Sequence, residues 1–218
     1  MGIAAEWGYW HPVWRADRLS PGELVTTVLL NEQVVLWRDL DQGLIHAAVD
    51  RCPHRGAALS LGRIEGGQLR CAYHGWCFDQ QGQCTEVPAL PYFSPPKSYR
   101  LQRYDVRIEY GLVWLARGDA EMPLFDAEGD TSRRHLLCGP YKLSASAPRI
   151  VENFLDMGHF AFVHEHLLGH RDHCEIPDYH VVHDALGIVV ESAQALQPKA
   201  GRSLKWLLRF VRGLLSRA

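Results

Sequence analysis

The sequence lacks any run of about eighteen apolar residues, so a membrane-spanning helix is not expected. Its first residues contain no basic segment followed by an apolar one, and Glu6 stands where a myristoylation signal has Ser or Thr, so we expect neither a secretory signal nor a lipid anchor. Six cysteines in 218 residues are too sparse for a disulfide scaffold. These absences favour the reducing cytosol, where Cys and His in a regular pattern usually mean a metal site.

Composition and charge further narrow the class of protein to which this chain can belong. Hydrophobic residues make up 47% of the chain and charged residues 22%, which excludes a disordered protein. The formal net charge is −2, but residues 199–218 carry six basic side chains and no acid. Residues 1–198 therefore have 17 basic against 25 acidic residues, a charge of −8. An acidic body of this kind does not favour nucleic acid as a partner.

Local patterns predict strands first and a helix later. Val, Thr and aromatic residues between Gly, Asn and Asp turns predict an antiparallel β unit with strands at 24–30, 33–37, 44–49, 104–110 and 112–116. Residues 117–140 are acidic and irregular, which indicates a linker. A helical pattern runs from Arg149 to about Leu168, and two strands are expected at 180–183 and 187–196.

Residues 201–218 have the pattern of a basic amphipathic helix, with Leu204 and Leu208 on one face and Lys205 and Arg209 on another. Such a helix would dock on its own domain or, less favourably, contact a membrane surface or a partner. Another interpretation is a truncated or frameshifted gene whose new end has a helical pattern by chance.

Two Cys–His pairs form the first candidate metal centre. Cys52 and His54 are followed, after sixteen residues, by Cys71 and His74, and each pair lies on a turn between expected strands. Zinc is one interpretation, although zinc ligands are usually paired with about two to four residues between them. The pattern C-x-H…C-x-x-H resembles the Rieske iron–sulfur motif, and so do the flanking residues Arg55-Gly56 and Gly75-Trp76.

The Rieske resemblance implies a [2Fe–2S] cluster with Cys52 and Cys71 on one iron and His54 and His74 on the other. Ala57 and Tyr73 stand where respiratory Rieske proteins carry an additional disulfide, so the resemblance is to soluble ferredoxins and oxygenases. We expect a reduction potential in the lower part of the Rieske range of roughly −150 to +300 mV.

A second candidate site lies at 152–164. Asn153, Asp156 and His159 are spaced by three, so a helix presents them on one broad face, and His164 follows five residues later. The helix must distort or end for both histidines to reach one metal. Two histidines and a carboxylate are typical of a two-His-one-carboxylate iron site.

This stretch resembles the mononuclear-iron motif of Rieske non-haem iron oxygenase α subunits, nearest the phthalate and O-demethylase branch. The resemblance implies that His159 and His164 bind Fe(II). It implies catalytic roles for Asp156, as a bridge to a cluster histidine of a neighbouring subunit, and for Asn153, near the iron. Family members take a third ligand, an aspartate, from a late helix with no counterpart here, so we expect an incomplete iron site.

The resemblance implies an α+β fold that is mostly antiparallel β: a Rieske-type β domain at 7–116, a linker at 117–140, the beginning of an α+β catalytic domain at 141–200, C-terminally shortened, and the helix at 201–218. We expect a cytoplasmic oxidoreductase, homotrimeric in analogy to the family, with a reductase or ferredoxin as electron donor. Its reaction would be O₂-dependent hydroxylation or demethylation of an organic, often aromatic, substrate. The alternative is a ferredoxin-like electron-transfer module without oxygenase activity.

Overall fold

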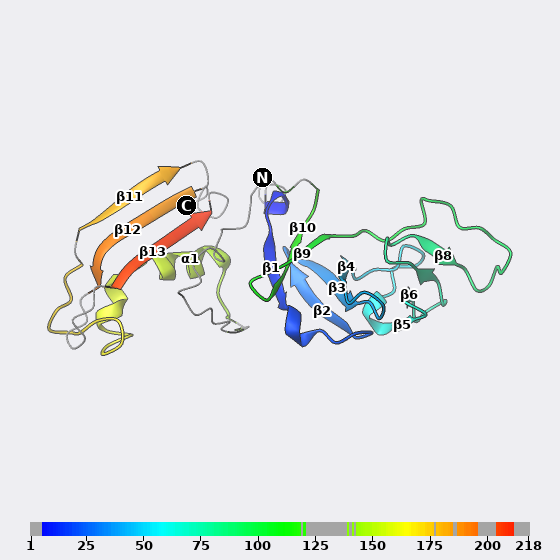
Figure 1. Cartoon of the computed structure of the whole chain (residues 1–218), viewed down its shortest axis with the longest axis horizontal. Helices are drawn as coiled ribbons and strands as arrows, with labels where there is room; N and C mark the ends of the chain where they lie inside the picture. Colours follow the sequence, from blue (N-terminus) through cyan, green and yellow to red (C-terminus); the bar gives the residue numbers. More distant parts are fainter. Residues whose placement is uncertain are drawn as a thin grey trace. The chain divides into compact units, whose positions relative to one another are not determined.

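The computed structural model describes residues 6–118, 120, 139, 141, 143–176, 178–184, 187–195 and 204–211. The chain divides into two compact units, Met1–Pro140 and Tyr141–Ala218, coloured from blue to green and from green to red in Figure 1. In this described part of the chain, no helix is long and apolar enough to cross a membrane.

Within its described residues, the first unit contains three antiparallel sheets and three short 3-10 turns. The sheet orders are β1-β10-β9, β2-β3-β4 and β5-β6-β7-β8. The elements are η1 (Glu6–Gly8), β1 (His11–Arg15), η2 (Ala16–Arg18), β2 (Leu24–Leu29), β3 (Glu32–Arg38), β4 (Ile45–Val49), η3 (Leu59–Leu61), β5 (Arg63–Glu65), β6 (Gln68–Arg70), β7 (Cys77–Phe78), β8 (Cys84–Glu86), β9 (Asp105–Glu109) and β10 (Leu112–Ala116).

Two-residue turns set the register of two hairpins. Leu30 and Asn31, with φ of +47° and +65°, join β2 to β3, and Tyr110 and Gly111, with φ of +56° and +72°, join β9 to β10. Positive φ at both central residues is typical of the type I′ turn, whose twist matches that of paired strands. The predicted strands at 24–30 and 33–37, and at 104–110 and 112–116, are therefore present as two hairpins. The predicted α+β, mostly antiparallel fold class is confirmed.

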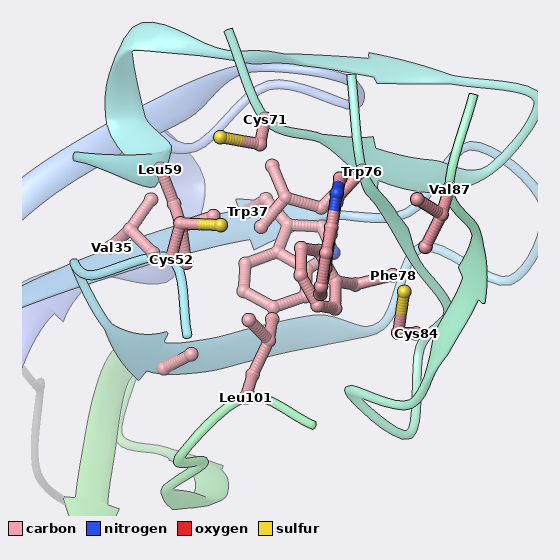
Figure 2. Close-up of a cluster of buried hydrophobic side chains, with 12 residues drawn as sticks. Val35, Trp37, Cys52, Leu59, Cys71, Trp76, Phe78, Cys84, Val87 and Leu101 are labelled. Carbon is pink, nitrogen blue, oxygen red and sulfur yellow. The ribbon is translucent and has the colours of Figure 1, made fainter. Parts of the chain in front are cut away.

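Strand β3 contributes to two hydrophobic cores because its side chains alternate between its faces. Val35 and Trp37 belong to the core beneath the two Cys–His loops, which Figure 2 shows, whereas Val34 and Leu36 belong to the other core. All four side chains are buried. Burial on both faces explains why this segment is a continuous apolar run.

A buried hydrogen-bonded pair closes the loop between β3 and β4. Asp39 is fully buried, and its carboxylate lies 3.0 Å from Nε2 of His46 and accepts the backbone N–H groups of Gln42 and Leu44 at 2.9 and 3.3 Å. Burial by itself raises the pKa of Asp39, but the hydrogen bonds from His46 and the backbone outweigh it and hold that pKa below its ordinary value.

Because its folded-state pKa is depressed, Asp39 contributes stability above its unfolded-state pKa of about 3.9, and this contribution is lost as pH falls towards the folded-state value. We expect Asp39→Asn to lower the free energy of unfolding at neutral pH by about 1–3 kcal/mol and to weaken its acid dependence. Urea unfolding at a series of pH values measures both quantities. Asp41→Asn, on an exposed side chain of the same loop, is the control. The prediction would be contradicted if the free energy of unfolding fell equally with decreasing pH in Asp39→Asn and in the unmodified protein.

The second unit begins with one helix and continues into a sheet. Helix α1 (Ala147–Leu155) has a proline in its first turn, and a 3-10 turn, η4 (Gly158–Ala161), follows it. The antiparallel sheet has the order β11-β12-β13, with β11 (Tyr179–Asp184), β12 (Gly187–Ala195) and β13 (Leu204–Val211). The helix thus ends at Leu155, well before the predicted Leu168.

The predicted C-terminal helix at 201–218 is wrong for Leu204–Val211, which form strand β13. This strand pairs with β12 from Gly187↔Val211 to Ala195↔Leu204, so it provides backbone partners along the length of β12. A short apolar run that includes Trp206 and Phe210 suits a strand as well as a helix, and sheet pairing decides between them. The rest of the predicted helix, and most of the predicted linker at 117–140, lie outside the described residues.

Candidate metal centres

The first Cys–His loop follows strand β4. The N–H of Cys52 donates to the carbonyl oxygen of Ala57 at 2.8 Å, and the N–H of Gly56 donates back to the carbonyl oxygen of Cys52 at 2.9 Å. These two bonds close a compact turn that contains His54. Gly56 has a φ of +74°, a conformation that glycine adopts without steric cost.

The second Cys–His loop, between β6 and β7, repeats the same backbone hydrogen bonds. The N–H of Cys71 donates to the carbonyl oxygen of Trp76 at 2.9 Å, and that of Gly75 donates to the carbonyl oxygen of Cys71 at 3.1 Å. Gly75 has a φ of +70°. Each loop therefore has its glycine four residues after its cysteine, although the histidine offsets differ. This equal spacing is visible in the sequence, but the sequence analysis did not use it.

The two loops bring the four predicted ligands together. The rings of His54 and His74 lie 4.7 Å apart between centroids. The thiols of Cys52 and Cys71 are buried at the edge of the core, where Figure 2 shows both sulfur atoms, and they are close enough to interact electrostatically. His54 is half-buried and His74 is exposed. Two thiols thus face the interior, and one imidazole reaches the surface.

The pKa shifts of Cys52 and His54 favour the binding of a metal cation at this site. Burial, and then the negative charge of Cys71, raise the pKa of the Cys52 thiol to about 11, so the thiolate that binds iron needs a nearby cation. Burial, and then the charge of His74, lower the pKa of His54 and favour its neutral, metal-binding form. Nδ1 of His54 is buried without a hydrogen-bond partner, as expected of an atom that binds a metal.

Among the described residues, no three or more Cys, His, Asp or Glu side chains form a group suited to one metal ion. In a Rieske cluster each iron takes two protein ligands, so a set of two thiols and two imidazoles on two loops fits a two-iron cluster.

Packing around the loops holds their side chains in place. The indole of Trp76 stacks on the imidazole of His54, with centroids 4.5 Å apart and planes 5° from parallel. The ring of Tyr99 in turn stacks on Trp76, with centroids 5.2 Å apart. Arg70 donates to the carbonyl oxygen of Gly75 and to the carboxylate of Glu86, both at 3.0 Å. No sequence pattern indicates these roles for Tyr99, Arg70 and Glu86, because contacts between separate loops leave no local pattern.

The second candidate site lies just after α1. The rings of His159 and His164 have centroids 5.1 Å apart, a separation that suits two imidazoles on one metal ion. The carboxylate of Asp156 lies 3.2 Å from Nδ1 of His159 and also accepts the N–H of Gly158 at 2.8 Å. A carboxylate on the far nitrogen of a histidine is the arrangement that orients metal-binding imidazoles. Helix α1 ends at Leu155, before both histidines, so His159 lies in η4 and His164 in the loop that follows it.

A close backbone packing keeps His164 near His159. A Cβ atom added to Gly169 would lie 2.8 Å from Cα of Ala161, so only glycine allows the loop after His164 to pack against η4. The other predicted residue of this site, Asn153, contributes less. Asn153 is exposed on α1 and has no hydrogen bond to Asp156, His159 or His164. Glu165 forms an ion pair with Arg171 at 2.8 Å.

Family models match the chain in two segments that contain the two sites. Residues 9–104 match the Rieske [2Fe-2S] domain, and residues 143–209 match the vanillate O-demethylase oxygenase C-terminal domain. The methylxanthine N1-demethylase NdmA of Pseudomonas putida is 39% identical over 178 residues, which cover 78% of this chain and 50% of the demethylase.

Two solved structures are similar to most of the chain. NdmA of Pseudomonas putida CBB5 with caffeine has a TM-score of 0.77 and 34% identity, over 87% of this chain and 57% of that chain. Dicamba monooxygenase with non-haem iron and dicamba has a TM-score of 0.66 and 26% identity, over 84% and 52%.

The fold and the paired Cys–His loops thus define a Rieske-type [2Fe–2S] protein with a second, oxygenase-type unit. The chain thus carries a Rieske [2Fe-2S] domain and a vanillate O-demethylase oxygenase C-terminal domain, and it is similar to Rieske non-haem iron oxygenase α subunits of the O-demethylase-like branch. The prediction of a [2Fe–2S] cofactor is confirmed, whereas the individual ligands stay predictions. The chain spans about half the length of the curated demethylase.

Proposed function

We propose that this chain acts as the terminal oxygenase component of a Rieske non-haem iron system. The observation that carries the proposal is the pair of matching loops that brings Cys52, His54, Cys71 and His74 together, with the two imidazoles 4.7 Å apart. The bound cofactors would supply electron transfer and O₂ activation for hydroxylation or demethylation of a small organic substrate. The demethylase named above supports this reaction class, and no finding favours an electron-transfer module without oxygenase activity.

The protein's own residues would hold and orient the two centres. Cys52 and Cys71 would bind one cluster iron as thiolates, and His54 and His74 would bind the other as neutral imidazoles. His159 and His164 would bind Fe(II), with Asp156 fixing the ring of His159 through Nδ1. The non-haem iron in dicamba monooxygenase supports an iron at the second site. We also propose that Asn153 lies near this iron.

The assembly and the compartment are part of the same proposal. His74 is exposed and the Asp156 side chain is 58% exposed, which supports the expected bridge from Asp156 to a cluster histidine of a neighbouring subunit in a homotrimer. A separate reductase or ferredoxin would supply the electrons. The five cysteines that the structure describes are free thiols, which supports the expected cytoplasmic compartment. We propose that residues 7–116 form the Rieske domain, 117–140 a linker, and the residues from 141 onwards the beginning of the catalytic domain. The two family matches support this division.

The first test is the cofactor itself. The full chain, produced with iron and sulfide and purified without oxygen, is expected to contain iron and acid-labile sulfide and, when reduced, to give the low-average-g EPR signal of a Rieske centre. His74→Cys is expected to lower the midpoint potential of any cluster that remains, because an anionic ligand replaces a neutral one. A colourless protein that contains one zinc would refute the proposed function.

The second iron site is expected to bind Fe(II) weakly, because the described residues bring two imidazoles together without a free carboxylate beside them. We expect Asp156→Ala to weaken this binding by about 10- to 100-fold, because His159 loses the group that orients it. Anaerobic Fe(II) titration of the cluster-loaded protein measures the affinity, and the cluster EPR signal should not change. Glu152→Ala, an exposed acid of α1 paired with Arg149, is the matched control. Equal affinities of all three proteins would contradict the prediction.

A further inference from the structure

A half-open cleft of about 410 Å³ lies beside the first Cys–His loop. Cys52 and His54 form part of its lining, together with the side chains of Arg51, Arg55 and Arg100, and no acidic residue lines it. The cleft therefore concentrates positive charge directly against two predicted cluster ligands. The charge of Arg55 also acts on His54 and contributes to the lowered pKa of that imidazole.

The three arginines of the cleft are exposed and have no ion-pair partner in the part of the chain that the structure describes. Six other arginines of the described residues form ion pairs with carboxylates: Arg15, Arg63, Arg70, Arg117, Arg149 and Arg171. The positive charge of the cleft also contrasts with the charge of −8 on residues 1–198. An unpaired group of like charges on an acidic body costs repulsion energy unless a partner of opposite charge binds there.

We infer that this cleft is the docking site for an acidic electron-transfer protein that reduces the cluster. The inference rests on the proposed function, since it needs a cluster that accepts electrons. Small-molecule pockets are mostly apolar and enclosed, whereas this cleft is charged and open, so it fits carboxylate side chains on a protein surface. Redox partners form small, short-lived interfaces in which charge complementarity sets the association rate.

The position of the cleft would allow a docked donor to pass its electron to the cluster. Because Cys52 and His54 line it, a donor held by Arg51, Arg55 and Arg100 would have its surface against the loop that is predicted to hold the cluster. Attraction of this kind raises association rates by about 10- to 1,000-fold and weakens as salt shortens the Debye length, which is about 10 Å at 0.1 M. A strong salt dependence is therefore the expected signature.

The experiment is stopped-flow reduction of the cluster-loaded full chain by an acidic plant-type [2Fe–2S] ferredoxin, photoreduced beforehand, over a range of ionic strengths. We expect the second-order rate of the unmodified protein to fall steeply with salt. Arg51→Gln, Arg55→Gln and Arg100→Gln together are expected to slow it by about tenfold or more at low ionic strength and to flatten the salt dependence. Arg18→Gln, on an exposed arginine of η2 that does not line the cleft, is the matched control and should keep the original rate.

Two further measurements make the result specific. Reduction by photoreduced 5-deazariboflavin, a neutral donor, should differ far less between the variants than reduction by ferredoxin, which separates docking from any change in the cluster. Ferredoxin rates that stay equal in the triple variant and the unmodified protein would overturn the docking site and leave the proposed function intact. A change of oligomeric state in the triple variant, seen by sedimentation, would assign the cleft to contacts between copies of this chain and would also overturn it. A protein without a Rieske EPR signal would overturn both proposals.

Discussion

Cys52→Ser is expected to abolish the [2Fe–2S] cluster, while Cys84→Ser is expected to leave it in place. Both cysteines are 3% exposed and belong to the same hydrophobic core, so the two substitutions disturb packing to a similar extent. They differ in position, because Cys52 lies on a ligand loop beside Cys71, whereas Cys84 lies on β8 and donates to the carbonyl oxygen of Glu86. A serine oxygen is a harder and much less acidic ligand than a thiolate, so it cannot replace the sulfur on iron.

Iron, acid-labile sulfide and the EPR spectrum of the reduced protein measure the outcome for both variants, and circular dichroism checks that each has folded. Loss of nearly all cluster iron in Cys52→Ser with an unchanged cluster in Cys84→Ser is the expected result. An intact Rieske spectrum in Cys52→Ser would remove this residue from the ligand set.

Gly62→Ala is expected to cost roughly 3 kcal/mol of folding free energy or more and to prevent the cluster from forming. A Cβ atom at Gly62 would lie 2.1 Å from the carbonyl oxygen of Arg70 and 2.9 Å from that of Leu59. Neither carbonyl belongs to a flexible side chain, so the backbone must move. Arg70 directly precedes Cys71, and the displacement therefore reaches the second ligand loop.

The control for this substitution is Gly8→Ala, where the added Cβ atom meets nothing within 4 Å. Chemical unfolding gives the free energy of each variant, and metal analysis gives its cluster content. Because Gly62→Ala can fail to fold, the cluster content is measured on whatever folded fraction remains after gel filtration. A Gly62→Ala protein as stable as Gly8→Ala, with a full cluster, would show that the loops tolerate the displacement.

The sequence by itself determined the features that depend on local chemistry. The spacing of Cys52, His54, Cys71 and His74 predicted the Rieske class, and the family comparison confirmed that class. The alternation of Val, Thr and aromatic residues with Gly and Asn turns predicted the strands of β2, β3, β9 and β10, because a short turn limits its backbone to few conformations. The spacing of His159 and His164 predicted that a helix must distort or end for both to reach one metal, and the helix ends at Leu155, earlier than the predicted Leu168.

Only the tertiary structure decided the features that depend on residues far apart in the chain. Leu204–Val211 carry a pattern that suits a helix, and their pairing with β12 makes them a strand. The stacking of Trp76 on His54, the bonds of Arg70 to the second loop and the group of Arg51, Arg55 and Arg100 around one cleft likewise join separate segments. The physical reason is that periodicity and turn preferences report the backbone within a few residues, whereas burial and charge pairing depend on which segments the fold brings together.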